Sequence, residues 1–485
     1  MPIRNKPFIF LILLSLILIL SNSAICKNGN FGGGSGTVED PLLVEDIYDL
    51  QAIELWPSLT LSRHYLQICD IDASDTSNTS SSLYNDGRGF NPLGYYTSNL
   101  FTGSYDGNGH VIENLYINRP NLDYVGLFAN HAAGATVQNI ILKNVHITGR
   151  NYTGALAGWS AANVSNCYSS GDVYGTGTDY GYIGGIAGQI AGNISYCESS
   201  ATVTGLSEES WYIGGITGLL TGNMDRCIAR GDILSDYDYG RMVGGLVGMN
   251  AYSSKIIQSY ALGDFYGEMD IGGIAGINTG IIENCFSEGS EYEALRRVGS
   301  IAGYNSGRVA FCYSSGIVSS GLVGYNYEDY GKVADSFWKE YVGTGFDSFF
   351  YDYDEWLDEY SLASVFERCF STTSQEFKEK KTFTTPYHEN LIYWDFEPGT
   401  GVWCMIDGRT YPMFQWKVKK DITDALLGRK SFSIEEKSAH DINQDGVIDV
   451  GDVVGIGMSF AESARSKGSD TTSEVFPQTG SDPFP

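Results

Sequence analysis

From residue 101 onward, the apolar residues of this chain come in short pieces separated by Gly, Asn, Thr or Ser. Val111-Ile112 and Ile140-Ile141 are examples. Such pieces are too short for helices, and they are interrupted too regularly for one long hairpin. The pattern therefore predicts many brief strands joined by bends.

One phrase, clearest as IGGIAG or VGGLVG, marks the period of this pattern between residues 125 and 324. Its copies follow one another at intervals of 22 to 30 residues. The first Gly of each copy is Gly126, Gly154, Gly184, Gly214, Gly244, Gly272, Gly299 or Gly321. A period of this length predicts a solenoid, in which each repeat forms one turn, or rung.

Within one repeat, Ile183 and Ile186 can point inward while the Gly residues allow neighbouring backbones to approach closely. We expect a second strand over residues 193–197 and a third over 201–204. Rungs stacked about 4.8 Å apart would make three parallel sheets around one core. The predicted fold is an all-β solenoid, a parallel β-helix of about eight or nine rungs over residues 101–338, with end caps.

The segments outside the repeat divide the rest of the chain. Residues 27–100 are predicted to form a lead and N-terminal cap, with apolar spacing that favours a short helix over 47–55. Residues 339–420 form an acidic, aromatic insertion and C-terminal cap. In that insertion, spacing from Trp356 to Val365 favours a helix, and Asp347, Asp352, Asp354 and Glu355 are an alternative cation or sugar site. Residues 421–464 are predicted as a calcium-binding segment with a helix over 422–427, and 465–485 as a disordered tail.

Residues 1–26 are typical of an export signal, with a basic start, an apolar run from Phe8 to Leu20 and a small-residue exit. An uncleaved anchor is the competing interpretation, although the run is shorter than the roughly 20 residues of a full membrane span. We expect a secreted or cell-surface protein, with no stable membrane span once the signal is removed.

Charge narrows the classes of partner. The chain has 30 Lys and Arg against 58 Asp and Glu, a formal net charge of -28, so nucleic acid and anionic lipid would be repelled. Calcium ions and neutral glycans remain compatible with this negative charge as partners. We expect a monomer.

Five cysteines occupy the same place in successive repeats, with Ser259 in the one repeat that lacks a Cys. These cysteines are Cys167, Cys197, Cys227, Cys285 and Cys312. We interpret them as an interior ladder of small side chains, because like residues of neighbouring rungs point in parallel, which disfavours disulfides. Cys69, Cys369 and Cys404 could pair near the ends, but the sequence selects no partners.

Residues 441–452 carry the strongest local motif, DINQDGVIDVGD. It places oxygen ligands at loop positions 1, 3, 5, 7, 9 and 12 with Gly at 6, the arrangement that Ca²⁺ prefers. The predicted Ca²⁺ ligands are Asp441, Asn443, Asp445, the Val447 carbonyl, Asp449 and Asp452. This loop resembles the calcium loop of dockerins. That resemblance implies docking to a cohesin-like module, but dockerins carry two such loops and this chain shows one, so a calcium-clamped helix pair that only folds the C-terminus is the alternative.

The Gly phrase together with the closing segments resembles the GLUG-repeat family of exported proteins over residues 101–416. The closing segments are Ser336-Phe337-Trp338, Trp394-Asp395-Phe396 and Tyr411-Pro412. The resemblance implies a parallel β-helix in a surface or secreted protein, and it implies no catalytic residue.

Aromatic residues precede several copies of the phrase and should line one edge of the solenoid. The predicted glycan-binding edge consists of Tyr180, Tyr182, Trp211, Tyr212, Tyr237 and Tyr239. Stacked aromatics can bind sugar rings, but ordinary packing explains the same pattern.

No common hydrolase, metalloprotease or phosphate-loop motif is present, and the sequence identifies no catalytic residue. Our first hypothesis is a non-catalytic, secreted or cell-surface binding protein that recognises a partner or glycan and attaches through its calcium-stabilised end. The alternative is a polysaccharide hydrolase or lyase, brought to a scaffold through that end.

Overall fold

The computed structural model describes two compact units, residues 1–372 and 373–485. The described residues are 29–55, 60–95, 100–177, 181–206, 212–235, 241–292, 296–316, 318, 321–327, 330–339, 366–367, 370–372, 402–404 and 412–426.

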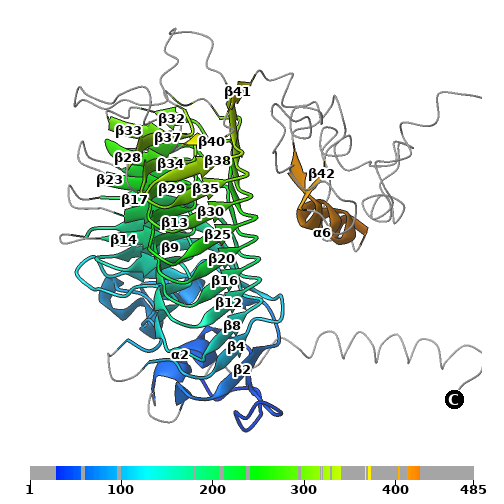
Figure 1. The fold of residues 1–485 in the computed structure, drawn as a ribbon. Helices are drawn as coiled ribbons and strands as arrows, with labels where there is room; N and C mark the ends of the chain where they lie inside the picture. Colours follow the sequence, from blue (N-terminus) through cyan, green and yellow to red (C-terminus); the bar gives the residue numbers. More distant parts are fainter. Residues whose placement is uncertain are drawn as a thin grey trace, which may run out of the picture. The chain divides into compact units, whose positions relative to one another are not determined.

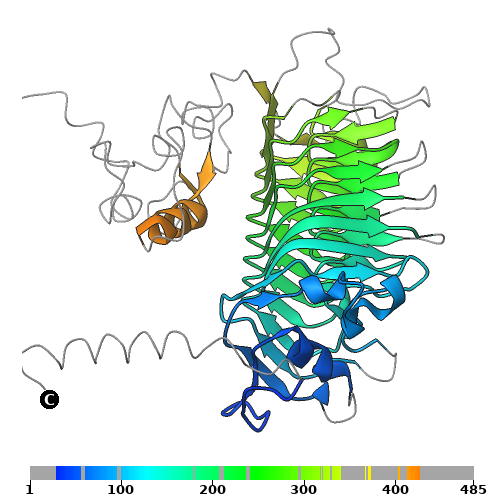
Figure 2. The same cartoon turned by 180° about the vertical axis from the view of Figure 1, so that it is seen from behind.

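The first unit is a parallel β-solenoid built from four sheets (Figures 1 and 2). Sheet 1 has 12 strands: β1 (Leu42–Val44), β2 (His64–Gln67), β4 (Ser104–Asp106), β8 (Thr136–Gln138), β12 (Asn163–Ser165), β16 (Asn193–Ser195), β20 (Asn223–Asp225), β25 (Lys255–Ile257), β30 (Ile281–Glu283), β35 (Arg308–Ala310), β38 (Lys332–Ala334) and β40 (Phe366–Glu367). Figure 1 shows its strands from β2 to β38 one above another in chain order.

Sheet 2 has 15 strands, of which 11 form its main path: β3 (Ile71–Asp72), β5 (Val111–Glu113), β9 (Ile141–Gly149), β13 (Tyr168–Gly175), β17 (Glu198–Gly205), β21 (Ile228–Ala229), β26 (Tyr260–Ala261), β31 (Phe286–Ser287), β36 (Tyr313–Ser314), β39 (Phe337–Lys339) and β41 (Phe370–Thr372). The strands off this path are β6 (Tyr116–Asn118), β22 (Ile233–Ser235), β27 (Phe265–Tyr266) and β32 (Glu291–Tyr292).

Sheets 3 and 4 are formed by the two halves of the Gly phrase. Sheet 3 has eight strands: β7 (Phe128–His131), β11 (Ala157–Ser160), β15 (Ala187–Ile190), β19 (Thr217–Leu220), β24 (Val247–Asn250), β29 (Ala275–Asn278), β34 (Ala302–Asn305) and β37 (Val323–Asn326). Sheet 4 has six: β10 (Thr153–Gly154), β14 (Tyr182–Gly184), β18 (Tyr212–Gly214), β23 (Arg241–Gly244), β28 (Met269–Gly272) and β33 (Arg296–Gly299).

The solenoid is confirmed, but its turns differ from the prediction in number and in make-up. Six turns contribute a strand to every sheet, against the predicted eight or nine, and each of these turns passes through four sheets rather than three. The reason lies in the phrase, which bends after Gly184 into two strands. A Cβ on Gly188 would lie 2.5 Å from backbone atoms of Tyr152, so only Gly lets sheets 3 and 4 approach at backbone contact.

The core is the inward-facing side of these sheets. In the three-residue strands of sheet 1 from β4 to β38 the central residue points inward, as Tyr105, Val137, Ile194 and Val333 do, and these side chains are buried. Burying each such side chain contributes roughly 2 kcal/mol. The alternation of polar, apolar and polar residues in these short strands therefore sets which face is core.

Parallel pairing extends beyond the predicted repeat at both ends. β1, β2 and β3 lie in the segment predicted as lead and cap, and β40 and β41 lie in the predicted insertion. The helix predicted over residues 47–55 is present as α2 (Ile47–Leu55), whose Ile47, Leu50 and Ile53 are buried. Two short 3₁₀ helices follow at Ser74–Thr76 and Ser82–Gly87. The helix predicted from Trp356 and the acidic residues 347–355 lie outside the described residues.

The described part of the second unit is small. β42 (Trp403–Cys404) and β43 (Met413–Phe414) pair antiparallel, and α6 runs over Gln415–Leu426. The helix predicted over 422–427 thus begins earlier, and the boundary placed after residue 420 falls inside it. The predicted tail, residues 465–485, lies outside the described residues.

The five repeat cysteines form the predicted interior ladder. All are buried with free thiols, and each thiol donates a hydrogen bond to the carbonyl oxygen two residues before it. The N–H of Cys167 donates to Cys197 Sγ in the next turn at 3.4 Å. Ser259 makes the same two bonds: its hydroxyl donates to the Ile257 carbonyl and accepts from the N–H of Cys227. Ser336 does so beyond Cys312, donating to the Ala334 carbonyl and accepting from the N–H of Cys312. Each of these residues lies in the bend between a strand of sheet 1 and the next strand of sheet 2, and the position requires a small side chain that can donate back to the end of the preceding strand.

A second buried row consists of amides at the last residue of the four later strands of sheet 3, β24, β29, β34 and β37. Asn250, Asn278, Asn305 and Asn326 are joined in sequence by hydrogen bonds from Nδ2 to the next Oδ1, at 2.7, 2.7 and 2.6 Å. The same row holds Leu220, Ile190, Ser160 and His131 in the earlier turns. The sequence analysis did not predict this amide row.

Candidate functional site

Several predicted site residues lie outside the described part of the chain. These are the six calcium-loop residues Asp441, Asn443, Asp445, Val447, Asp449 and Asp452, and four of the six edge residues, Tyr180, Trp211, Tyr237 and Tyr239. Within the described part, no group of three or more His, Cys, Asp or Glu side chains is placed to hold a metal ion.

The two remaining edge residues, Tyr182 and Tyr212, belong to a longer row of tyrosines. Tyr124, Tyr152, Tyr182 and Tyr212 stand at the same place in four successive turns, two residues before the first Gly of the phrase. Their ring centroids are 4.6, 4.8 and 4.9 Å apart, with interplanar angles of 15°, 30° and 10°. Tyr124 and Tyr152 belong to this row but were not among the predicted edge residues.

The stacking decides what this tyrosine row can do. A sugar binds an aromatic ring through the ring face, but both faces of Tyr152 and of Tyr182 are covered by neighbouring rings. Burial, with smaller contributions from the hydroxyls of Tyr182 and Tyr124, raises the pKa of Tyr152 to about 12. The row therefore presents ring edges and hydroxyl groups, and this geometry favours packing over a sugar platform.

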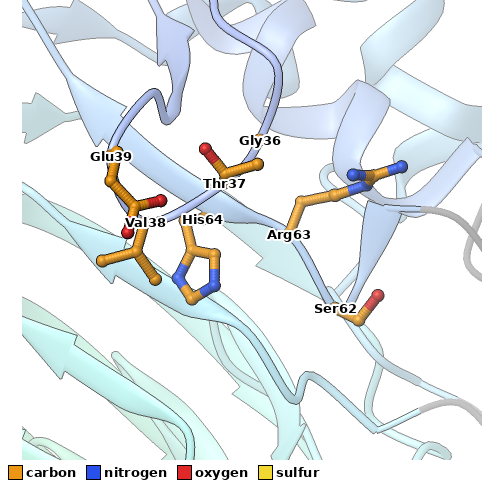
Figure 3. Close-up of a pocket in the computed structure, with 7 residues that line it drawn as sticks. All are labelled: Gly36, Thr37, Val38, Glu39, Ser62, Arg63 and His64. Carbon is orange, nitrogen blue, oxygen red and sulfur yellow. The ribbon is translucent and has the colours of Figure 1, made fainter.

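A more suitable site lies at the N-terminal end of sheet 1, where two cavities adjoin. The first, drawn in Figure 3, has a volume of about 410 Å³ and is lined by residues 36–39 and 62–64. In Figure 3 Val38 and His64 lie side by side, while Arg63 points away from them. The second, which we call the strand cavity, has a volume of about 370 Å³ and shares Val38 and His64 with the first.

The strand cavity is built on three neighbouring strands. β2 supplies His64 and Leu66, β4 supplies Ser104 and Asp106, and β8 supplies Thr136 and Gln138. These residues point outward because Tyr65, Tyr105 and Val137 between them point into the core. Val38, which is 69% exposed, and Pro41 add apolar surface at its margin.

Hydrogen bonds hold the polar groups of this cavity in place. His64 Nδ1 and Ser104 Oγ are 2.7 Å apart. Asp106 accepts from Gln138 Nε2 at 2.8 Å, from Asn139 Nδ2 at 2.9 Å and from the backbone N–H of Asn108 at 2.8 Å. The cavity thus combines ordered hydrogen-bonding groups with apolar surface, which suits a ligand that has both hydroxyl groups and C–H faces.

Sequence reasoning missed the strand cavity because its residues are far apart in the chain. Register, in which His64 pairs with Ser104 and Ser104 with Thr136, brings them together. A local signal exists in Ser104-Tyr105-Asp106 and Thr136-Val137-Gln138, whose alternation predicts two outward polar groups per strand. The register between these strands is not specified by either segment alone.

No helix in the described residues has the length and apolar character needed to cross a bilayer.

The chain is similar in part to two curated proteins. It is 40% identical over 144 residues to halomucin from Haloquadratum walsbyi, and 33% identical over 118 residues to a provisionally named Gly-rich membrane protein from Evansella cellulosilytica. These matches cover 29% and 24% of this chain but only 2% and 13% of the two relatives. No family model matches the chain, so the GLUG and dockerin assignments stay predictions.

Among solved structures, the chain is similar to a provisionally assigned immunoglobulin A1 protease from Bacteroides ovatus. The TM-score is 0.41 at 17% identity, with coverage of 80% of this chain and 97% of the other.

Proposed function

We propose that this protein is an exported, cell-surface β-solenoid that binds a glycan in the strand cavity without cleaving it. The observation that carries the proposal is the cavity itself, in which hydroxyl, imidazole, amide and carboxylate groups from three strands face apolar Val38 and Pro41. Sugars present the same combination of hydroxyl groups and C–H faces. Rigid strands hold the polar groups in position before binding, which lowers the entropy cost of recognition.

The carboxylates favour binding over hydrolysis. A glycosidase needs two carboxyl groups that flank one bond, with one of them free to exchange a proton. Asp106 is the single carboxylate among the residues that line the strand cavity, and three donors already engage it. Glu39, which lines the adjoining cavity, is the group on which the alternative of a polysaccharide hydrolase or lyase would depend.

The remaining parts of the proposal rest on sequence. We infer export from the signal-like residues 1–26. The recurrent Gly phrase is the basis for proposing that the chain is a GLUG-repeat protein. The dockerin-like loop is the basis for proposing attachment to a cohesin-like module. The partial similarity to a relative named as a membrane protein supports a surface location.

Binding is tested by removing two hydroxyls that line the strand cavity. The double variant Ser104→Ala, Thr136→Val is expected to lower affinity for the best glycan on a glycan array by about tenfold, because two hydrogen bonds are lost. Thr202→Val, on the outward face of sheet 2, is the matched control and should bind as the wild type does. Equal binding by the double variant would contradict the proposed site, and release of reducing sugar by the wild type would favour the hydrolase.

Calcium binding is tested separately in the C-terminal loop. Asp445→Ala removes a central carboxylate ligand, so the heat of Ca²⁺ binding in calorimetry is expected to disappear, together with any Ca²⁺-dependent rise in melting temperature. Glu436→Gln, outside the loop, should titrate like the wild type. An unchanged titration of Asp445→Ala would refute the loop as the site.

A further inference from the structure

A row of uncharged polar side chains continues from the strand cavity along the outer face of sheet 1. It consists of the first residue of β4, β8, β12, β16 and β20: Ser104, Thr136, Asn163, Asn193 and Asn223. These residues are in register from strand to strand, and Figure 1 shows the five strands stacked in succession. We call them the polar row.

The three asparagines of the polar row form an exposed amide ladder. Asn193 Nδ2 donates to Asn163 Oδ1 at 3.3 Å, and Asn223 Nδ2 donates to Asn193 Oδ1 at 3.1 Å. A primary amide has two N–H donors and two acceptor lone pairs, so these bonds use one of each at Asn193. The remaining donor and acceptor are available to a ligand, and the ladder holds the amide in one orientation, which reduces the entropy lost on binding.

The polar row and the strand cavity form one continuous surface, because Ser104 and Thr136 belong to both. Successive strands of a sheet are about 4.8 Å apart. This repeat is close to the length of one sugar unit in an extended chain. Consecutive sugar units could therefore meet consecutive strands.

From these observations we infer that the ligand is a linear, neutral polysaccharide that lies along the solenoid axis, with one end in the strand cavity and its length on the polar row. This inference rests on the proposed function and names its substrate class. It assigns Asn163, Asn193 and Asn223 as binding residues, which neither the sequence motifs nor the comparisons indicate.

Charge defines both the class of polysaccharide and the end of the site. No residue of the polar row is charged, whereas the next positions in the same register are Lys255, Ile281, Arg308 and Lys332. The net charge of -28 repels a polyanion at long range. The surface suited to neutral sugars thus ends at Asn223, one strand before Lys255.

Chain length of the ligand provides the test. We would titrate the protein with disaccharides and hexasaccharides of β-1,4-linked glucose, xylose and mannose, and with hexagalacturonate as the acidic probe. The wild type is expected to bind one neutral hexasaccharide at least tenfold more tightly than its disaccharide. Asn193→Ala should weaken hexasaccharide binding severalfold and leave disaccharide binding unchanged. Lys255→Ala, one strand beyond the polar row, should change neither the affinity for the hexasaccharide nor the affinity for the disaccharide.

The outcomes separate this inference from the proposed function. If the protein bound the disaccharide and the hexasaccharide with equal affinity, the extended site would be refuted, but the strand cavity would still stand as the proposed binding site. Tighter binding of hexagalacturonate than of every neutral hexasaccharide would overturn the neutral class. No binding of any probe would count against both. Melting temperatures check folding, and the exposed position of Asn193 predicts that Asn193→Ala folds as the wild type does.

Discussion

His131→Asn is expected to remove a large acid-dependent loss of stability. His131 is fully buried, its ring centroid is 4.4 Å from that of Phe128, and burial lowers its pKa to about 3. The folded protein therefore keeps His131 neutral, whereas the unfolded chain protonates it below about pH 6.5. As pH falls from 6.5 towards 3, the unfolded state gains a proton that the folded state excludes, and stability declines by about 1.4 kcal/mol per pH unit, or roughly 4 kcal/mol in all.

Asparagine is the matched replacement because the same row holds Asn250, Asn278 and Asn305 in later turns. The introduced amide can also keep a hydrogen bond to Ser160 Oγ, which is 2.9 Å from His131 Nδ1 in the wild type. The free energy of unfolding of both proteins would be measured by urea denaturation from pH 7 to pH 4. Carboxylates that titrate in this range contribute equally to both curves, so the difference reports His131. Parallel curves would show that the buried histidine is not the acid-sensitive group.

Asn278→Ala is expected to cost about 3 kcal/mol of stability, from the loss of three hydrogen bonds, to Asn250, to Asn305 and to the Arg308 carbonyl, and from a new cavity. Asn278 accepts from Asn250 Nδ2 and donates to Asn305 Oδ1, both at 2.7 Å, and it is fully buried. Removing the amide leaves polar atoms of both neighbours short of a partner where water does not reach them. That penalty exceeds the small net gain of an ordinary hydrogen bond.

The exposed amide ladder supplies the control for this prediction. Asn223→Ala also interrupts an asparagine ladder, but water can replace the bond that Asn223 donates to Asn193. Its cost is expected to be within about 0.5 kcal/mol, as for most surface substitutions. Urea denaturation of both variants at pH 7 measures the contrast. Equal losses would mean that burial does not determine the contribution of these ladders.

The two amide ladders also show where sequence reasoning stopped. Each is a set of Asn residues about one repeat apart, and the residue type alone does not distinguish Asn278, which is buried, from Asn223, which is exposed. The cysteine ladder was predicted because a small sulfur side chain at a constant repeat position suits an interior. An amide side chain is compatible with the interior and with the surface. Whether a given Asn is buried therefore depends on which strand it occupies and on which face of the sheet its side chain lies.

The tyrosine edge illustrates the same limit for function. Recurrence placed Tyr182 and Tyr212 correctly in one row, but recurrence cannot tell whether rings stand apart, with open faces, or lie against one another. At a spacing of 4.9 Å the two rings stack. The strand cavity, whose residues come from three distant segments, had no recurrent pattern to reveal it.

The amino-acid sequence by itself determined that this chain forms a parallel solenoid, where its turns repeat and which small side chains line its interior. A periodic pattern contains that information because every repeat must bury the same face against its neighbours. Only the tertiary structure decided that the Gly phrase splits into two sheets and that His64, Ser104 and Thr136 meet in one cavity. Those features depend on strand register and on backbone contact across turns, neither of which the period of the repeat specifies.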